Sequence, residues 1–179
     1  GQRDDRSFNS SEEPEQDGKP AAAAAFAAFA DELKVRWDKD YIYIESEGMP
    51  AHPMMVGIRA WNQQVPLPQD YSGNNAFRLP RRPRFAEKPS GLPYLGPVAV
   101  AINGVPIFNP IKQDGRTDTV TAGELDEFGG HAGRADDYHY HKAPLHLQKK
   151  VGKDKPIAYA MGGFPIYGEK DLDGKKPSD

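Results

Sequence analysis

Four of the five histidines lie in one short, glycine-rich segment, residues 129–147, which reads GGHAGRADDYHYHKAPLHL. In an extended chain, side chains two positions apart point to the same side. His139 and His141 therefore share one face of the YHYH stretch, and Tyr138 and Tyr140 share the other. Two imidazoles on one strand face can chelate a metal ion, while the tyrosine face can pack into a core and hold the strand in place.

A third ligand has to come from outside the YHYH stretch. His131 is the natural choice, because the glycines around it permit a tight turn that brings it back over the strand. Asp126 is the alternate ligand, and Glu124 is the next candidate. Three histidines, or two with a carboxylate, are the usual protein ligands of a zinc or copper(II) ion that keeps an open coordination position.

Other residues near the segment have two interpretations each. Asp136 and Asp137 could fix the tautomer of an imidazole, or could simply form the turn before the strand. His146 follows a proline that disturbs the register and ranks below the other three histidines. His52 could form a soft copper(I) site with nearby methionines, although core methionines and an ordinary loop position for His52 are the preferred interpretation. The histidines of the segment could also be structural groups without a metal.

Composition excludes several classes of function. The chain has 179 residues, a net charge of −3 and no cysteine. Without a basic excess, nucleic-acid binding is not expected, and without cysteine there is no disulfide, catalytic thiolate or Cys-ligated metal. No run of about twenty apolar residues is available to span a membrane. No Gly-x-Ser-x-Gly element offers a nucleophile, so a hydrolase would depend on metal-bound water, and the sequence leaves open whether the protein is an enzyme.

The elements that position the histidines begin after a polar leader. Residues 1–20 are acidic and almost free of aliphatic side chains, which predicts a disordered leader. An apolar stripe predicts a helix over 21–37 that packs on the domain; it consists of Phe26, Phe29, Leu33 and Trp37. The domain itself is expected over 38–170, followed by a flexible tail over 171–179.

Alternation predicts strands at 40–48, with Tyr41 and Tyr43 on one face, and at 54–61. Residues 62–97 are rich in proline and read as a long irregular segment, which is either a functional loop or a wrap around the domain. Its four arginines form a small basic patch, which is interpreted as a solvated loop or an anion site; they are Arg78, Arg81, Arg82 and Arg84.

An internal repeat is the clearest sign of the fold. VAVAINGVPIFNP (98–110) aligns without gaps to IAYAMGGFPIYGE (157–169), with an offset of 59 residues. Gly104 and Gly163 can adopt positive φ at a turn, and a proline follows each of them two positions later. Each copy therefore predicts a strand–turn–strand corner. The expected fold is mainly β, with two pseudo-repeated corners, long proline-rich loops and one N-terminal helix, and the histidine segment lies between the corners.

The sequence resembles the YHYH-domain proteins, which are named for the motif that stands here at residues 138–141. The resemblance extends through HPMMVGI, WNQQVPLPQDYSGNNAFRLP, VAVAINGVPIFNP, GELDEFGGHAGRADDYHYH and GKDKPIAYAMGGFPIYG, and so covers about residues 47 to 168. In the family, Cys often follows the first histidine of the motif. Here that residue is Ala132, which removes a thiolate or disulfide at this position and leaves an imidazole and carboxylate site possible.

The resemblance implies an exported protein, secreted or periplasmic, and Gly1 in place of Met is consistent with a removed signal peptide. It also implies a second Gly-His…Tyr-His-Tyr-His segment after the second corner, whereas this sequence ends at Asp179 before such a copy. Either the chain is a fragment of a longer two-repeat protein, or the protein has one copy of the histidine segment. In the second case, pairing between two chains would cover the exposed edge of the sheet. Together the residues predict a metal-binding domain with zinc or copper, with two alternatives. One is a metal-dependent hydrolase, and the other is a cell-surface binding module with structural histidines.

Overall fold

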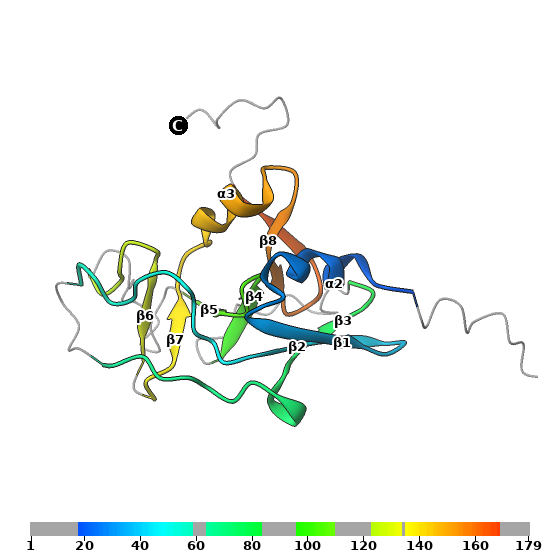
Figure 1. Ribbon diagram of the computed structural model, residues 1–179, viewed down its shortest axis with the longest axis horizontal. Helices are drawn as coiled ribbons and strands as arrows, with labels where there is room; N and C mark the ends of the chain where they lie inside the picture. Colours follow the sequence, from blue (N-terminus) through cyan, green and yellow to red (C-terminus); the bar gives the residue numbers. More distant parts are fainter. Residues whose placement is uncertain (1–17, 59–63, 84–95, 110–122, 134, 169–179) are drawn as a thin grey trace, which may run out of the picture.

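The described residues contain two β-sheets (Figure 1). The computed structural model describes residues 18–58, 64–83, 96–109, 123–133 and 135–168. One sheet is antiparallel with the order β1-β2-β3, formed by β1 (Leu33–Trp37), β2 (Tyr41–Ser46) and β3 (Phe77–Pro80). The other has six strands in the order β6-β7-β5-β4-β8-β9. Its members are β4 (Pro97–Ala101), β5 (Pro106–Phe108), β6 (Gly130–Ala132), β7 (Tyr138–Tyr140), β8 (Pro156–Ala160) and β9 (Pro165–Tyr167). The mainly-β expectation is confirmed.

The helical segments are short, and the prediction of a helix over 21–37 is wrong for the second half of that range. It comprises only α2 (Ala21–Ala25) and the 3-10 turn η2 (Phe26–Phe29), after which Leu33 and Trp37 lie on β1. Between Leu33 and Trp37 the apolar residues alternate with charged ones, and β1 pairs with β2 over its full length. Pairing with β2 outweighs the helical spacing, because the same residues satisfy a period of two as well as a period near 3.6. The other helical elements among the described residues are η3 (Gly73–Asn75), η4 (Leu145–Leu147) and α3 (Gln148–Val151).

Two further expectations differ from the structure. The strand expected at 54–61 is absent from its described part, where residues 55–57 form a bend and turn with positive φ at Met55 and Gly57, and 59–61 lie outside the described residues. The irregular segment 62–97 contains β3, an edge strand that ends at Pro80, as an edge position allows. The strand expected at 40–48 is confirmed as β2, with Ile42 and Ile44 on its buried face.

The two copies of the internal repeat form hairpins that are related by a local two-fold axis. Val100 of β4 lies opposite Tyr159 of β8, its equivalent under the 59-residue offset, and Ala99 pairs with Ala160 just as Ala101 pairs with Ala158. Both hairpins have the same bulge near the start of their first strand. Their long-range hydrogen bonds also correspond, since Ile102 N–H donates to Ile157 and Met161 N–H donates to Val98, both at 3.0 Å. The predicted strand–turn–strand corners are therefore confirmed.

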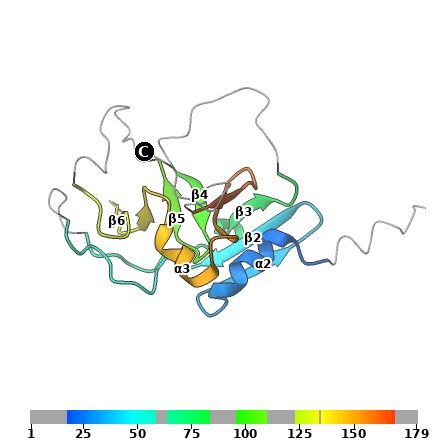
Figure 2. The same ribbon diagram turned by 90° about the horizontal axis from the view of Figure 1, so that it is seen from above.

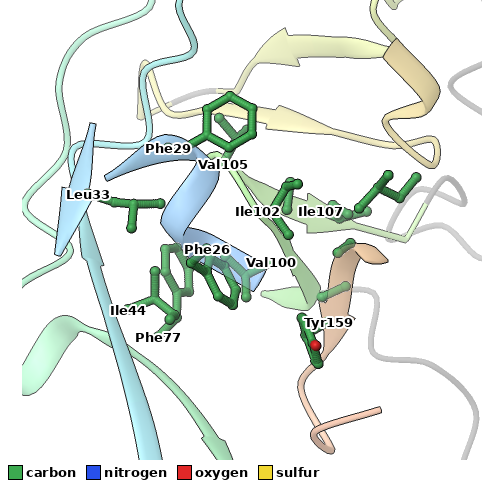
Figure 3. Packing of buried hydrophobic residues seen from close by; sticks show 14 of the residues in the cluster. Phe26, Phe29, Leu33, Ile44, Phe77, Val100, Ile102, Val105, Ile107 and Tyr159 are labelled. Carbon is green, nitrogen blue, oxygen red and sulfur yellow. The ribbon is translucent and has the colours of Figure 1, made fainter. Parts of the chain in front are cut away.

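The core lies where the hairpins, α2, η2 and the three-stranded sheet meet. Figure 3 shows Phe26 between Ile44 and Phe77 on one side and Val100 on the other. Phe26 is fully buried and its ring stacks on Tyr159 with centroids 5.7 Å apart. Strands β6 and β7 lie at the end of the molecule away from β1–β3 in both views (Figures 1 and 2). No helix among the described residues is long and apolar enough to cross a membrane.

Candidate metal centre

Strands β6 and β7 place three imidazoles on one face. The strands are antiparallel, and His131 of β6 lies directly opposite His139 of β7. His141 follows the end of β7, and its N–H donates to the Gly129 carbonyl at 2.8 Å, which continues the ladder by one bond. Strand β7 also pairs in parallel with β5 through Ile107 and Tyr140, so the first hairpin of the repeat holds the YHYH strand in the sheet. We call His131, His139 and His141 the imidazole triad.

Each imidazole of the triad donates its Nδ1 hydrogen to a backbone carbonyl. The acceptors lie at 2.7–2.9 Å, and they are Glu124 for His131, Asp137 for His139 and Asn109 for His141. A carbonyl oxygen can only accept, so Nδ1 carries the proton in all three rings. In a neutral imidazole this leaves a lone pair on Nε2. Three separate segments of backbone therefore fix the same tautomer in all three rings.

The three Nε2 atoms converge on one point. Their mutual distances are 3.1 Å, 3.0 Å and 3.1 Å. With the protons on Nδ1, these contacts cannot be hydrogen bonds, because each Nε2 offers a lone pair and no donor. Burial, followed by the nearby rings of His139 and His131, lowers the pKa of His141 to about 3, so this ring is neutral at pH 7. Such an arrangement of lone pairs requires a cation between them or costs repulsion.

The spacing of the Nε2 atoms suits a transition-metal ion. An ion between the three nitrogens would be held by the Nε2 atoms of His131, His139 and His141. Three protein ligands would leave such an ion able to bind water or another donor. Within the described residues, the only group of three or more His, Asp or Glu side chains that could hold an ion is this triad.

Packing holds the ring of His139 from both sides. Phe108 of β5 stacks on it with centroids 4.3 Å apart and planes inclined by 14°. On another side, a Cβ atom at Gly133 would lie 3.0 Å from its Cε1 atom and 2.8 Å from Asp137 Oδ1. A residue larger than glycine at position 133 would therefore have to displace the His139 ring or the Asp137 carboxylate. His131 and His139 are both 4% exposed.

Asp126, the alternate ligand expected from the sequence, is not part of the group. Its carboxylate accepts backbone N–H bonds from Met55, Phe128 and Gly130 at 3.0–3.1 Å, and the Tyr138 hydroxyl donates to it at 2.7 Å. Asp126 thus lies on the tyrosine side of β7 and shapes the loop that leads into β6. The expected alternation is otherwise correct: Tyr138 and Tyr140 are fully buried on the face opposite the triad.

The other residues considered from the sequence are placed separately. The Asp137 carboxylate lies 3.6 Å from His139 Nδ1, the nitrogen that points away from the triad centre. Glu124, the next candidate ligand, contributes its backbone carbonyl. His52 and His146 both contact the Tyr140 hydroxyl, on the tyrosine face. The carbonyl acceptors were not foreseen, since a backbone group has no signature in the sequence.

Two arginines of the proline-rich segment contact other parts of the described chain. Arg78 lies over the ring of Tyr41 at 4.4 Å. Arg81 donates to the carbonyls of Asp38 and Gly18 and ties the chain together there. Arg84 lies outside the described residues. The anion site therefore stays a prediction.

Comparison with known proteins identifies the family. Residues 76–178 match the family described as YHYH protein. No curated protein and no solved structure gives a significant match. The matched range includes the whole imidazole triad and makes up more than half of the chain, and the chain therefore belongs to the YHYH protein family.

Proposed function

We propose that the protein binds a transition-metal ion, zinc or copper(II), through the imidazole triad. One observation carries the proposal: three Nε2 lone pairs lie 3.0–3.1 Å apart, while each Nδ1 hydrogen is directed to a backbone carbonyl. Neutral imidazoles with this tautomer and orientation are typical metal ligands, and the hydrogen bond from Nδ1 both fixes the ring and raises its basicity. Imidazole without thiolate favours zinc or copper(II) over copper(I).

The test is elemental analysis of the full chain, purified without a histidine tag, before and after reconstitution with zinc or copper. We expect close to one triad-bound ion per chain in the wild type and its loss in the double variant His139→Ala/His141→Ala. Lys142→Ala is the matched control, because this exposed side chain lies in the same segment, next to His141, without joining the triad. If the double variant fails to fold by circular dichroism, His141→Ala, the least buried ligand, replaces it. A wild-type chain that binds neither ion after reconstitution would overturn the proposal.

A metal-dependent hydrolase is a second candidate, favoured by the three-ligand set, which leaves coordination positions for water. Such an enzyme also needs a base near the ion, and within the described residues no carboxylate joins the triad. Activity of the zinc-loaded chain on ester or phosphodiester substrates, absent from the double variant, would support this candidate.

We also propose that the protein is exported, as the family resemblance implies. Cell fractionation of the tagged chain tests this location.

A further inference from the structure

The tyrosine face of β7 carries a second group of ring donors. The Tyr140 hydroxyl lies 2.6 Å from His52 Nε2 and 3.2 Å from His146 Nε2. The side-chain amide of Asn103 donates to the same oxygen at 3.1 Å. We call His52, Tyr140 and His146 the phenol cluster. His52 lies far from the other two in the sequence, whereas Tyr140 and His146 are six residues apart, and none of the three belongs to the imidazole triad.

The phenol cluster repeats features of the triad. His52 donates Nδ1–H to the carbonyl of Pro53 at 2.8 Å, so its Nε2 lone pair points toward Tyr140. The rings of His52 and His146 are 4.9 Å apart and inclined by 87°, while the ring pairs of the triad are 4.7–4.9 Å apart and inclined by 81–89°. Two imidazoles are thus arranged as they are in the triad, with a phenol oxygen close to both.

The cluster is both reachable and rigid. His52 and His146 are half-buried, whereas Tyr140 is fully buried beneath them. Phe128 stacks on His52 with centroids 3.9 Å apart and meets the ring of His146 at 4.9 Å. An ion that enters from solvent would therefore contact the two imidazoles first, which Phe128 keeps in place. The phenol lies beneath them, at the base of the site.

The charges allow the phenol to become a ligand. The Tyr140 hydroxyl donates its hydrogen to the Nε2 lone pair of His52 at 2.6 Å, and the Asn103 amide donates to the oxygen that would carry the negative charge. Without an ion the phenol therefore keeps its proton. A bound cation favours the deprotonated ligand. Burial and the neighbouring His52 lower the pKa of His146 to about 4, so this imidazole is neutral at pH 7 and has a lone pair to offer.

We propose that the phenol cluster is a second metal site, which binds copper(II) through His52 Nε2, His146 Nε2 and the Tyr140 phenolate. On binding, the O–H bond of Tyr140 breaks, its proton leaves to solvent, and the oxygen forms a bond to the ion. In the metal-bound state His146 would carry its proton on Nδ1, so that the lone pair of Nε2 binds the ion. No oxidation or reduction is involved. The site stands independently of the triad, because it shares no ligand with it.

The experiment is titration of the metal-free full chain with copper(II), followed by visible absorption. A copper–phenolate bond gives a charge-transfer band, and the triad contains no phenol that could produce one. We expect two ions per chain and this band in the wild type. Tyr140→Phe should bind one ion without the band. His139→Ala/His141→Ala should also bind one ion but keep the band, so loss of the triad and loss of the phenol cluster are distinguishable.

Tyr167→Phe is the control, since this tyrosine is 45% exposed and lies outside the cluster; it should keep two ions and the band. If Tyr140→Phe does not fold, His52→Gln and His146→Gln act at half-buried positions and should each remove the band. A wild-type chain without the band, or a band that survives in Tyr140→Phe, overturns the proposal.

Discussion

At the scale of single residues, the position of one proton per ring separates the triad from an ordinary group of buried histidines. Structural histidines usually donate from one nitrogen and accept at the other. Here the three acceptor nitrogens face one another, and the donors all point outward to Glu124, Asp137 and Asn109. The i, i+2 spacing of His139 and His141 made their shared face predictable from the sequence. The carbonyls that select the tautomer were not predictable, because they depend on where the backbone of three loops passes.

Gly133 offers a test of how tightly the residues around the imidazole triad are packed. Its φ lies outside the left-handed region, so alanine brings no backbone strain there, but its Cβ atom would lie 3.0 Å from the His139 ring and 2.8 Å from Asp137 Oδ1. We expect Gly133→Ala to displace the ring and weaken metal affinity by about tenfold or more, as loss of ligand orientation does elsewhere. Calorimetric titration with zinc measures this. Ala135→Ser, in the same turn and exposed, should bind as the wild type does. Equal affinities for all three proteins would contradict the steric role.

Asp126 shows why a carboxylate near a histidine in sequence need not be a ligand. A short acidic side chain readily accepts bonds from nearby backbone N–H groups, and here it takes those of Phe128 and Gly130. We expect Asp126→Ala to lower the free energy of unfolding by about 3 kcal/mol or more, since each buried donor left unpaired costs about 1–3 kcal/mol. Urea denaturation compares it with the exposed neighbour Glu127→Ala, for which the change should stay within about 0.5 kcal/mol. A similar small change in both variants would show that the loop does not depend on Asp126.

At the scale of elements, the repeat made the two hairpins predictable and the remaining elements less so. An ungapped match over 13 residues fixes the strand–turn–strand pattern twice. Strand β1 was missed because Leu33 and Trp37 continue a helical spacing, and the competing alternation becomes decisive only when β2 is there to pair with it. Strand β3 was missed because its four residues lie in a proline-rich stretch, where pairing to β2 rather than local preference creates the strand.

The turn of the second hairpin lies close to the end of β3 in the other sheet. Gly163 has φ of 91°, and a Cβ atom there would lie 2.7 Å from the Pro80 carbonyl oxygen at the end of β3. We expect Gly163→Ala to destabilise the fold by more than the roughly 1 kcal/mol that a left-handed backbone alone costs a non-glycine residue. Thermal or urea unfolding measures the difference. Gly152→Ala is the matched control, because φ there is 90° with no atom within 4 Å, so it isolates the backbone cost. Equal losses in both variants would exclude a contribution from the contact with β3.

At the scale of the whole molecule, stability without metal should depend on pH through the buried imidazoles. The pKa of His141 is about 3 in the folded chain and near 6.5 in the unfolded one, so between these values only the unfolded chain takes up the proton. Stability therefore falls as the pH falls from about 6.5 toward 3, with a limiting slope of about 1.4 kcal/mol per pH unit for this group. Urea denaturation of the metal-free chain at pH 7, 6 and 5 measures the slope. His141→Gln should reduce it, and an unchanged slope in that variant would contradict the assignment.

Because side chains alternate between two faces along β7, the face that each one occupies depends on whether the turn before the strand has an odd or an even number of residues. Its three residues face alternately toward the triad and toward the buried tyrosine side. Deleting or inserting one residue in the turn 133–137, with pairing to β6 retained, would move the tyrosines into the imidazole position and the imidazoles into the core. A change of two residues would restore the original faces. Natural variation in this turn should therefore occur in steps of two, even where its composition varies freely.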